Sequence, residues 1–171
     1  FVVFVDSYSA AKHVDFLASK SHFIFAYKSL QIYLGIHPKQ IRTDMGREFL
    51  SKELSALLEA NGTNHVVCAR DEHHTVGAAE NAIHVLRSSA KAMMLGDNVP
   101  KRFWPFAISH AAYLNNIVSK SRADSNKTIF ELLFNRKADV RRIPPFGCYT
   151  TIFQDRRNLA DQSFGLGSTQ G

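Results

Sequence analysis

Two acidic residues, Asp44 and Glu80, stand where carboxylates could do chemistry. Asp44 follows a short apolar stretch over residues 36–43 that is typical of a strand, and it opens an Asp-x-Gly turn. Glu80 is predicted to lie on the first turn of a long amphipathic helix, and residues 45–79 separate the two acids. An acid at a strand end and an acid at a helix start can meet above a sheet edge. Two such carboxylates can bind a divalent metal and position phosphate chemistry.

Each acid also has an ordinary explanation. Aspartate before x-Gly is common at turns, because its side chain can bond the backbone two residues further on. Glu80 and His84 could be no more than a surface pair one helical turn apart. His73 and His74 could bind metal, but adjacent histidines point in different directions and no third ligand stands at a helical spacing, so we interpret them as loop residues.

The helix expected from Gly77 to about Leu95 carries two stripes. At 100° per residue the apolar stripe contains five residues: Ala79, Ile83, Leu86, Ala90 and Met93. Steps of four, three and four residues place Glu80, His84, Arg87 and Lys91 on a second stripe. One helix would then offer a carboxylate for metal and, further along, cations for phosphate oxygens. An ordinary solvated helix face remains the alternative.

The remaining pattern predicts a mixed α/β sheet with helices on both faces. Strands are expected over residues 1–5, 13–17, 36–43, 64–69 and 148–153, with the second antiparallel to the first. Helices are expected from a cap at Ser19 or Ser21 to residue 34, and over 51–60, 102–119 and 128–134. Residues 70–76 lack apolar rhythm and are expected to form an exposed loop. Trp104 is expected in the core.

Composition sets the broad class. The chain has 171 residues, 45% of them hydrophobic, which suits one folded domain. Two cysteines without a CxxC pattern fit a reducing compartment, and no apolar run reaches the length of a membrane span. Residues 1–85 hold 8 Lys/Arg and 9 Asp/Glu, whereas residues 86–171 hold 13 and 6. This asymmetry suits a polyanion binder, but charge alone favours the simpler explanation of a solvated cationic surface. Because the chain opens with Phe1 inside a strand, we expect it to be a piece of a longer protein.

Seven short stretches together resemble one family. Phe4 to Ser9 resembles F-I-D-D-Y-S, Arg42 to Phe49 resembles R-S-D-N-G-G-E-F, Gly77 to Glu80 resembles G-V-A-E, Pro100 to Trp104 resembles L-P-K-x-F-W, Tyr113 to Asn116 resembles Y-L-x-N-R, Thr128 to Leu132 resembles T-P-Y-E-L, and Phe146 to Cys148 reads F-G-C. Each is weak alone. In this order, and with the interval between Asp44 and Glu80, the chain resembles the integrase catalytic core of copia-type long-terminal-repeat retrotransposons, akin to retroviral integrases.

The resemblance implies a ribonuclease-H-like fold within a Pol polyprotein. It implies two Mg²⁺ or Mn²⁺ ions, with Asp44 and Glu80 as catalytic metal ligands, and His84, Arg87 and Lys91 toward DNA. The implied reactions are trimming of element DNA 3′ ends by water and joining of those ends to target DNA. The implied partners are element and target double-stranded DNA and further copies of the chain, with no membrane. The implied location is intracellular, in the nucleus or a cytoplasmic particle.

The resemblance also implies that part of the machinery lies outside the chain. The family's first acid stands on the strand before Phe1, so the first strand is expected to be missing and the fragment to be inactive alone. Met45, Val76, Asn81 and the absence of proline over residues 72–77 depart from the family pattern. Three readings stay open: a competent integrase core, a degenerate remnant that only binds nucleic acid, and another ribonuclease-H-like nuclease.

The expected division has three parts. Residues 1–121 form the catalytic core, residues 122–153 form a helix and strand extension of it, and residues 154–171 form a disordered tail.

Overall fold

The computed structural model of this protein describes residues 1–68 and 73–148. Its first element, β1 (Val2–Val5), pairs antiparallel with β2 (Lys12–Asp15), in a register that sets Val3 opposite Val14. The Asp6 carboxylate accepts a hydrogen bond from the Ser9 amide at 2.7 Å and so closes the turn between the strands. The two expected strands and their antiparallel pairing are confirmed.

A second pair of strands is parallel. β3 (Gln40–Thr43) pairs with β4 (Asn64–Val67), and the register sets Thr43 opposite Val67. β3 begins later than the expected residue 36. Pro38 has no amide hydrogen to give to a ladder, and its carbonyl instead accepts from the Thr63 hydroxyl at 2.7 Å.

The helix after β2 begins without the expected serine cap. A 3-10 turn, η1 (Lys20–His22), leads into α1 (Phe23–Leu34), and the hydroxyls of Ser19 and Ser21 bond each other at 2.7 Å instead of capping backbone amides. The expected end at Gly35 is confirmed, because Gly35 adopts a left-handed φ of 66°.

The connection from β3 to β4 follows the expected signals closely. After the turn η2 (Arg47–Phe49), α2 (Lys52–Ala60) starts at Ser51, whose side chain accepts a hydrogen bond from the Leu54 amide at 3.2 Å. Leu54 and Leu58 on this helix are buried.

The long helix starts earlier than predicted. α3 runs from His73 to Gly96, so the expectation of an exposed loop up to Val76 is wrong for the last part of that segment, and residues 69–72 lie outside the described residues. Glu80 consequently stands about two turns into the helix and not on its first turn. Gly77 does not start the helix; it is an internal residue with open space around its Cα.

The helix predicted over residues 102–119 is confirmed, except for the position of Trp104. The turn η3 (Lys101–Phe103) leads into α4 (Trp104–Val118). Trp104 is 44% exposed, so its expected core position is wrong. Its ring lies 5.9 Å from that of Phe1 and 5.6 Å from that of Phe16, at the rim of the β1–β2 pair.

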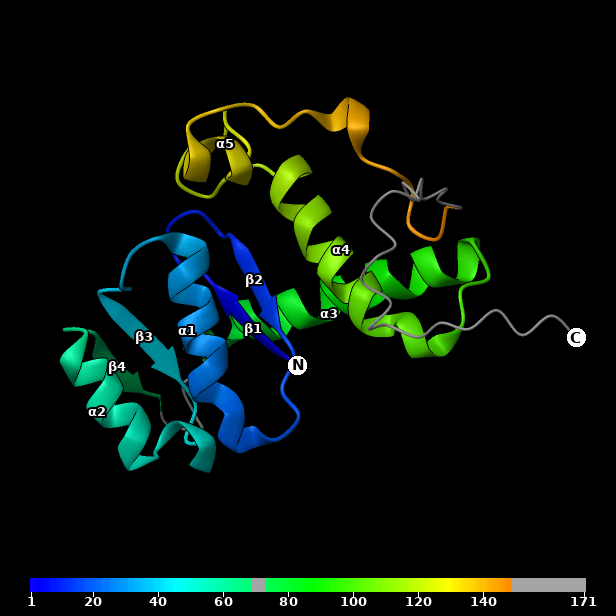
Figure 1. Cartoon of the computed structure of the whole chain (residues 1–171). Helices are drawn as coiled ribbons and strands as arrows, with labels where there is room; N and C mark the ends of the chain where they lie inside the picture. The colour runs from blue at the N-terminus through cyan, green and yellow to red at the C-terminus, as the bar shows by residue number, and fades with distance from the viewer. Residues whose placement is uncertain (69–72, 149–171) are drawn as a thin grey trace, which may run out of the picture.

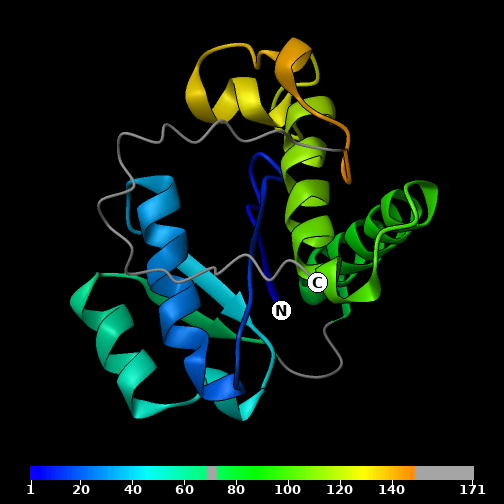
Figure 2. The same cartoon turned by 45° about the vertical axis from the view of Figure 1, so that its right-hand side comes forward.

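The helices enclose the strands in layers (Figures 1 and 2). α1 contacts β1 and β2 on one side, while α3 contacts β1 and β3 on the other. α4 lies against α3 and β2, and α2 lies against β4. Across Figure 1 the strands follow in the order β4, β3, β1, β2, with α1 in front of the middle pair. Among the described residues β1 pairs only with β2 and β3 only with β4.

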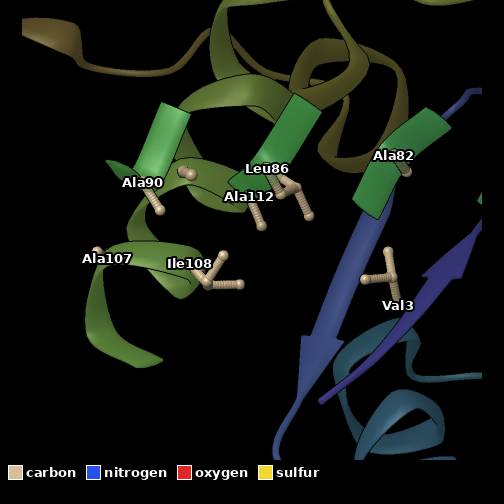
Figure 3. Close-up of a cluster of buried hydrophobic side chains, with 8 residues drawn as sticks. Val3, Ala82, Leu86, Ala90, Ala107, Ile108 and Ala112 are labelled. Atoms are coloured by element: carbon tan, nitrogen blue, oxygen red, sulfur yellow. The ribbon is translucent and has the colours of Figure 1, made fainter. Parts of the chain in front are cut away.

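Two apolar clusters form the core. One joins α3, α4 and β1 and contains Val3, Ala82, Leu86, Ala90, Ala107, Ile108, Ala111 and Ala112 (Figure 3). The second joins α1 to α2 and contains Phe23, Tyr27, Leu54 and Leu58, with Val2, Phe4 and Ile41 packed against it. Successive residues of β1 therefore face opposite helical layers, as in a strand covered on both faces.

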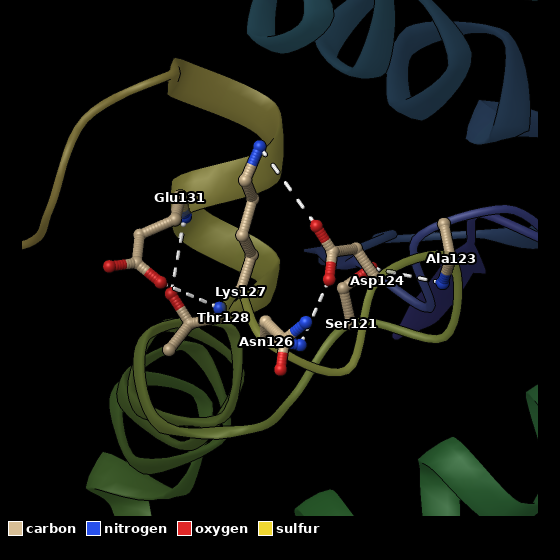
Figure 4. Close-up of polar contacts among 7 residues, drawn as sticks. All are labelled: Ser121, Ala123, Asp124, Asn126, Lys127, Thr128 and Glu131. Atoms are coloured by element: carbon tan, nitrogen blue, oxygen red, sulfur yellow. Dashed lines mark hydrogen bonds and ion pairs between the residues drawn. The ribbon is translucent and has the colours of Figure 1, made fainter.

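A short capped helix follows the core. α5 (Ile129–Phe134) begins at Thr128, whose hydroxyl accepts from the Glu131 amide at 3.2 Å while the Glu131 carboxylate accepts from the Thr128 amide at 2.7 Å (Figure 4). A last 3-10 turn, η4, spans Val140–Arg142. The expected strand over residues 148–153 and the expected tail lie almost wholly outside the described residues. Within residues 1–68 and 73–148, no helix combines the length and apolarity needed to cross a membrane.

Candidate active site

Asp44 lies in an exposed turn directly after β3, as predicted. Its Oδ1 accepts a hydrogen bond from the Gly46 amide at 2.9 Å, which is the ordinary aspartate turn contact. Within the described residues the hydrogen bonds of this carboxylate engage only Oδ1, and a carboxylate has a second oxygen, Oδ2, that can accept a ligand. The turn contact and a ligand role are thus compatible in one side chain.

Gly46 is held close to two carboxyl groups. A Cβ atom on Gly46 would lie 3.0 Å from Asp44 Oδ1 and 3.1 Å from Glu48 Cδ. Glu48, a residue that sequence reasoning did not single out, therefore stands on the same turn as Asp44. Its carboxylate also lies 3.5 Å from Lys20 Nζ, and this ion pair offsets part of the negative charge beside Asp44. A larger residue at position 46 would force the Asp44 carboxylate to move.

Thr43 and His65 hold the backbone of the Asp44 turn by hydrogen bonds. The buried Thr43 hydroxyl donates to the Asp44 carbonyl at 3.0 Å and lies 2.9 Å from His65 Nε2 on β4. The Thr43 carbonyl accepts from the Cys68 amide at 2.8 Å. Burial lowers the pKa of His65 below its ordinary value, which favours the neutral ring at pH 7.

Glu80 is exposed on α3, and α3 contacts β3, the strand that Asp44 follows. The structure therefore places the two predicted acids on elements that touch. Their distance stays a prediction of about 4 to 8 Å, the range in which two carboxylates share one cation directly or through water. Across the described parts of the chain, no three His, Cys, Asp or Glu side chains gather closely enough to hold a metal.

The basic stripe is exposed along α3. His84, Arg87 and Lys91 all face solvent, whereas Leu86 and Ala90 on the same helix are buried. The two predicted stripes are thus confirmed as separate faces. The Arg87 guanidinium lies 5.5 Å from the centre of the Phe1 ring, a cation–π contact that orients the guanidinium itself.

The chain is similar in sequence to a known retroelement protein. No family model matches the chain. The chain is 26% identical over 173 residues to the retrovirus-related Pol polyprotein from transposon TNT 1-94 of Nicotiana tabacum. This match covers 94% of the chain but only 12% of the tobacco polyprotein.

The fold of the chain is similar to solved structures of retroviral integration proteins. The catalytic core domain of HTLV-2 integrase, in complex with magnesium, matches with a TM-score of 0.63 and 25% identity over 77% of this chain and 82% of that one. A chain of the simian T-cell lymphotropic virus intasome in complex with PP2A regulatory subunit B56 gamma matches with a TM-score of 0.63 and 20% identity, covering 90% of this chain and 53% of that chain.

The fold is therefore the mixed α/β, ribonuclease-H-like fold of retroviral integrase catalytic cores. Sequence and fold together support an integrase core from a retroelement, as the seven motifs predicted.

Proposed function

We propose that the chain is the core of a copia-type retrotransposon integrase, a polynucleotidyl transferase that processes and joins DNA 3′ ends. The observation that carries this proposal is the contact between α3, which bears Glu80, and β3, which ends at Asp44, within an integrase-core fold. Asp44 and Glu80 are the catalytic ligands in this proposal, and element and target double-stranded DNA are the substrates.

The donor set suits Mg²⁺ or Mn²⁺. Asp44 and Glu80 offer hard carboxylate oxygens, which these ions prefer, and both side chains are exposed, so neither charge is buried without a partner. When bound, two such ions would activate the attacking oxygen and stabilise the leaving oxygen. The residues of this chain then have three tasks: Asp44 and Glu80 hold charge at the reacting phosphate, the Gly46 amide orients Asp44, and the α3 cations hold the DNA backbone.

A third acid and a further strand are proposed to come from residues before Phe1. β1 is apolar at all four positions and contacts helices on both faces, yet it pairs only with β2 among the described residues. β3 likewise pairs only with β4. One extended segment between β1 and β3 would join the two pairs into a single sheet, because a strand covered on both faces normally has two neighbours.

The proposed oligomer has a candidate surface on α1. Phe25, Ile32 and Ile36 on and just after this helix are 65%, 83% and 66% exposed. Phe25 and Ile32 are seven positions apart on α1, which places them on one side of the helix, and Ile36 follows the helix end at Gly35. Apolar side chains gathered on one exposed face support self-association of the chain on DNA.

A remnant that only binds DNA is the second candidate. It is favoured because the described residues bring no three potential ligands together, whereas the exposed cations of α3 are in place. In this second candidate function, the basic stripe of α3 would bind DNA, and Asp44 and Glu80 would not bind metal.

The test is a joining assay with a duplex carrying free 3′-hydroxyl ends and a supercoiled plasmid in Mg²⁺. The chain is compared with a longer chain in which the natural residues before Phe1 are restored. We expect joined product only from the longer chain, and none from its Asp44→Asn or Glu80→Gln variants. Joining by the 171-residue chain alone would refute the proposal that a third catalytic acid lies outside this chain. Full joining by the Asp44→Asn variant would refute the assigned site.

A further inference from the structure

The Asp44 turn is bonded to a residue far from it in sequence, His65 on β4. The contact runs through Thr43, which is 9% exposed and lies on β3 next to β4. Thr43 Oγ1 lies 3.0 Å from the Asp44 carbonyl oxygen and 2.9 Å from His65 Nε2. Thr43 and His65 thus connect β4 to the turn that carries the candidate metal ligand.

The chemistry of a hydroxyl fixes the direction of this chain of bonds. A hydroxyl has one hydrogen, and Thr43 gives it to the Asp44 carbonyl, which can only accept. Thr43 Oγ1 must then accept from His65, so Nε2 of the ring carries a hydrogen. The order of donation is therefore His65 Nε2–H to Thr43 Oγ1–H to the Asp44 carbonyl oxygen.

We propose that His65 is a positioning residue, which acts through the Thr43 hydroxyl to hold the Asp44 turn in the geometry that binds a divalent cation. The inference rests on the proposed function, because it gives a role to His65 only if Asp44 is a ligand. Through Thr43, His65 holds the peptide group between Asp44 and Met45. The Gly46 amide donates to Asp44 Oδ1 at 2.9 Å and so holds the carboxylate. Both bonds reduce the freedom of one short exposed turn, so that Oδ2 is presented in one direction.

Residues that orient a metal ligand have a measurable effect on metal affinity. Removal of a group that holds a ligand in place typically lowers metal affinity about 10- to 100-fold. Because His65 acts through a second residue, we place it at the low end, at about tenfold. Glutamine at position 65 can present an N–H donor near the position of Nε2, whereas leucine cannot. Valine at position 43 keeps the shape of threonine and removes the hydroxyl.

The test uses the full 171-residue chain without metal and then with Mn²⁺. The first measurement is the ¹⁵N–¹H NMR spectrum of the metal-free chain, in which the Met45 amide reports the hydrogen bond on the Asp44 carbonyl. We expect His65→Leu and Thr43→Val to shift the Met45 and Gly46 amide signals in the same way. His65→Gln should leave both signals near their parent positions. Asn64→Ala, at the other end of β4 and outside the hydrogen-bond chain, is the control and should also leave them unmoved.

The second measurement is Mn²⁺ binding by electron paramagnetic resonance. His65→Leu and Thr43→Val should each weaken binding about tenfold, and the double variant should be no weaker than either single one. His65→Gln should bind within about twofold of the parent. Additive losses in the double variant would overturn the proposal.

The two measurements separate two kinds of failure. If His65→Leu leaves the Met45 and Gly46 signals in place, His65 does not position the turn and the inference is wrong. If those signals move but the parent chain and every variant bind no Mn²⁺, the hydrogen-bond chain exists but Asp44 is not a ligand. That second outcome overturns the proposed function, and with it the positioning role toward metal.

Discussion

Asn116 closes the outer edge of the β1–β2 pair, and its removal gives a stability test with a defined size. Its side chain accepts from the Lys12 amide at 2.9 Å and donates to the Lys12 carbonyl at 2.8 Å, so it pairs with β2 as a neighbouring strand would. Asn116 is 6% exposed on α4. Asn116→Ala therefore removes two largely buried hydrogen bonds that join a helix to a sheet edge.

The expected loss follows from the number of bonds. Each contributes about 1 kcal/mol net, so Asn116→Ala should lower the free energy of unfolding by about 2 kcal/mol. For a chain of this size about 1 kcal/mol corresponds to about 2–4 °C, so Tm should fall by about 4–8 °C. Asn116→Asp can still accept from the Lys12 amide, but it cannot donate to the Lys12 carbonyl and it buries a charge beside that oxygen, so it should lose at least as much as Asn116→Ala.

The assay is urea unfolding followed by the fluorescence of Trp104, the single tryptophan, with calorimetry for Tm. Asn115→Ala is the matched control. Asn115 accepts from Lys12 Nζ at 2.6 Å, but that ammonium can turn to water, so the variant should lose less than about 1 kcal/mol. A Tm of Asn116→Ala within about 1 °C of the parent would refute the edge contact.

Three further outcomes are expected. The hydrogen bond from the Thr128 amide is the main cause that lowers the pKa of Glu131. The carboxylate therefore stabilises α5 above the unfolded pKa, and this contribution is lost as pH falls through the folded pKa. The parent should lose more unfolding free energy between about pH 6 and pH 3 than Glu131→Gln, and equal losses would contradict the capping role of Glu131. Arg87→Ala and Lys91→Ala should each flatten the log–log salt dependence of duplex DNA binding by about 1, and unchanged slopes would mean that α3 does not face DNA. Gly46→Ala should weaken Mn²⁺ binding about tenfold by displacing Asp44 Oδ1, which would lie 3.0 Å from the new Cβ, and parent-like affinity would show that the turn tolerates the methyl group.

The elements that the sequence predicted correctly depend on local signals. Ser51 and Gly35 act within one turn of their own helices, and the apolar run over residues 2–5 has no polar face to expose. The two faces of α3 follow from spacing alone, since Leu86 is fully buried and Arg87 beside it is exposed. Such features need no knowledge of what packs against them.

The errors lie where tertiary context decides. The sequence predicts a helix start at Gly77, but a glycine inside a helix costs only about 1 kcal/mol, which a helix packed over several turns can absorb. Trp104 was expected inside, yet its place at the end of α4 leaves it 44% exposed against Phe1 and Phe16. Hydrophobicity alone does not tell whether a residue sits at the middle or the rim of a core.

The candidate site was predictable in part. Asp44 and Glu80 stood out by residue type, spacing and family resemblance, and the structure places them on contacting elements. The link from His65 to Thr43 was not predictable, because it depends on the parallel register that sets Ile41 opposite His65. Register between strands separated by a helix is set by packing and not by a local motif.

The central claim is that Asp44 and Glu80 share a divalent ion. The most direct test is calorimetric titration of the 171-residue chain with Mn²⁺, using the parent, Asp44→Asn, Glu80→Gln and the double variant. If one ion is shared, each single variant should lose about tenfold or more in affinity, and the double variant should lose little beyond that. Parent-like affinity in both single variants, or losses that add fully in the double variant, would contradict a shared site.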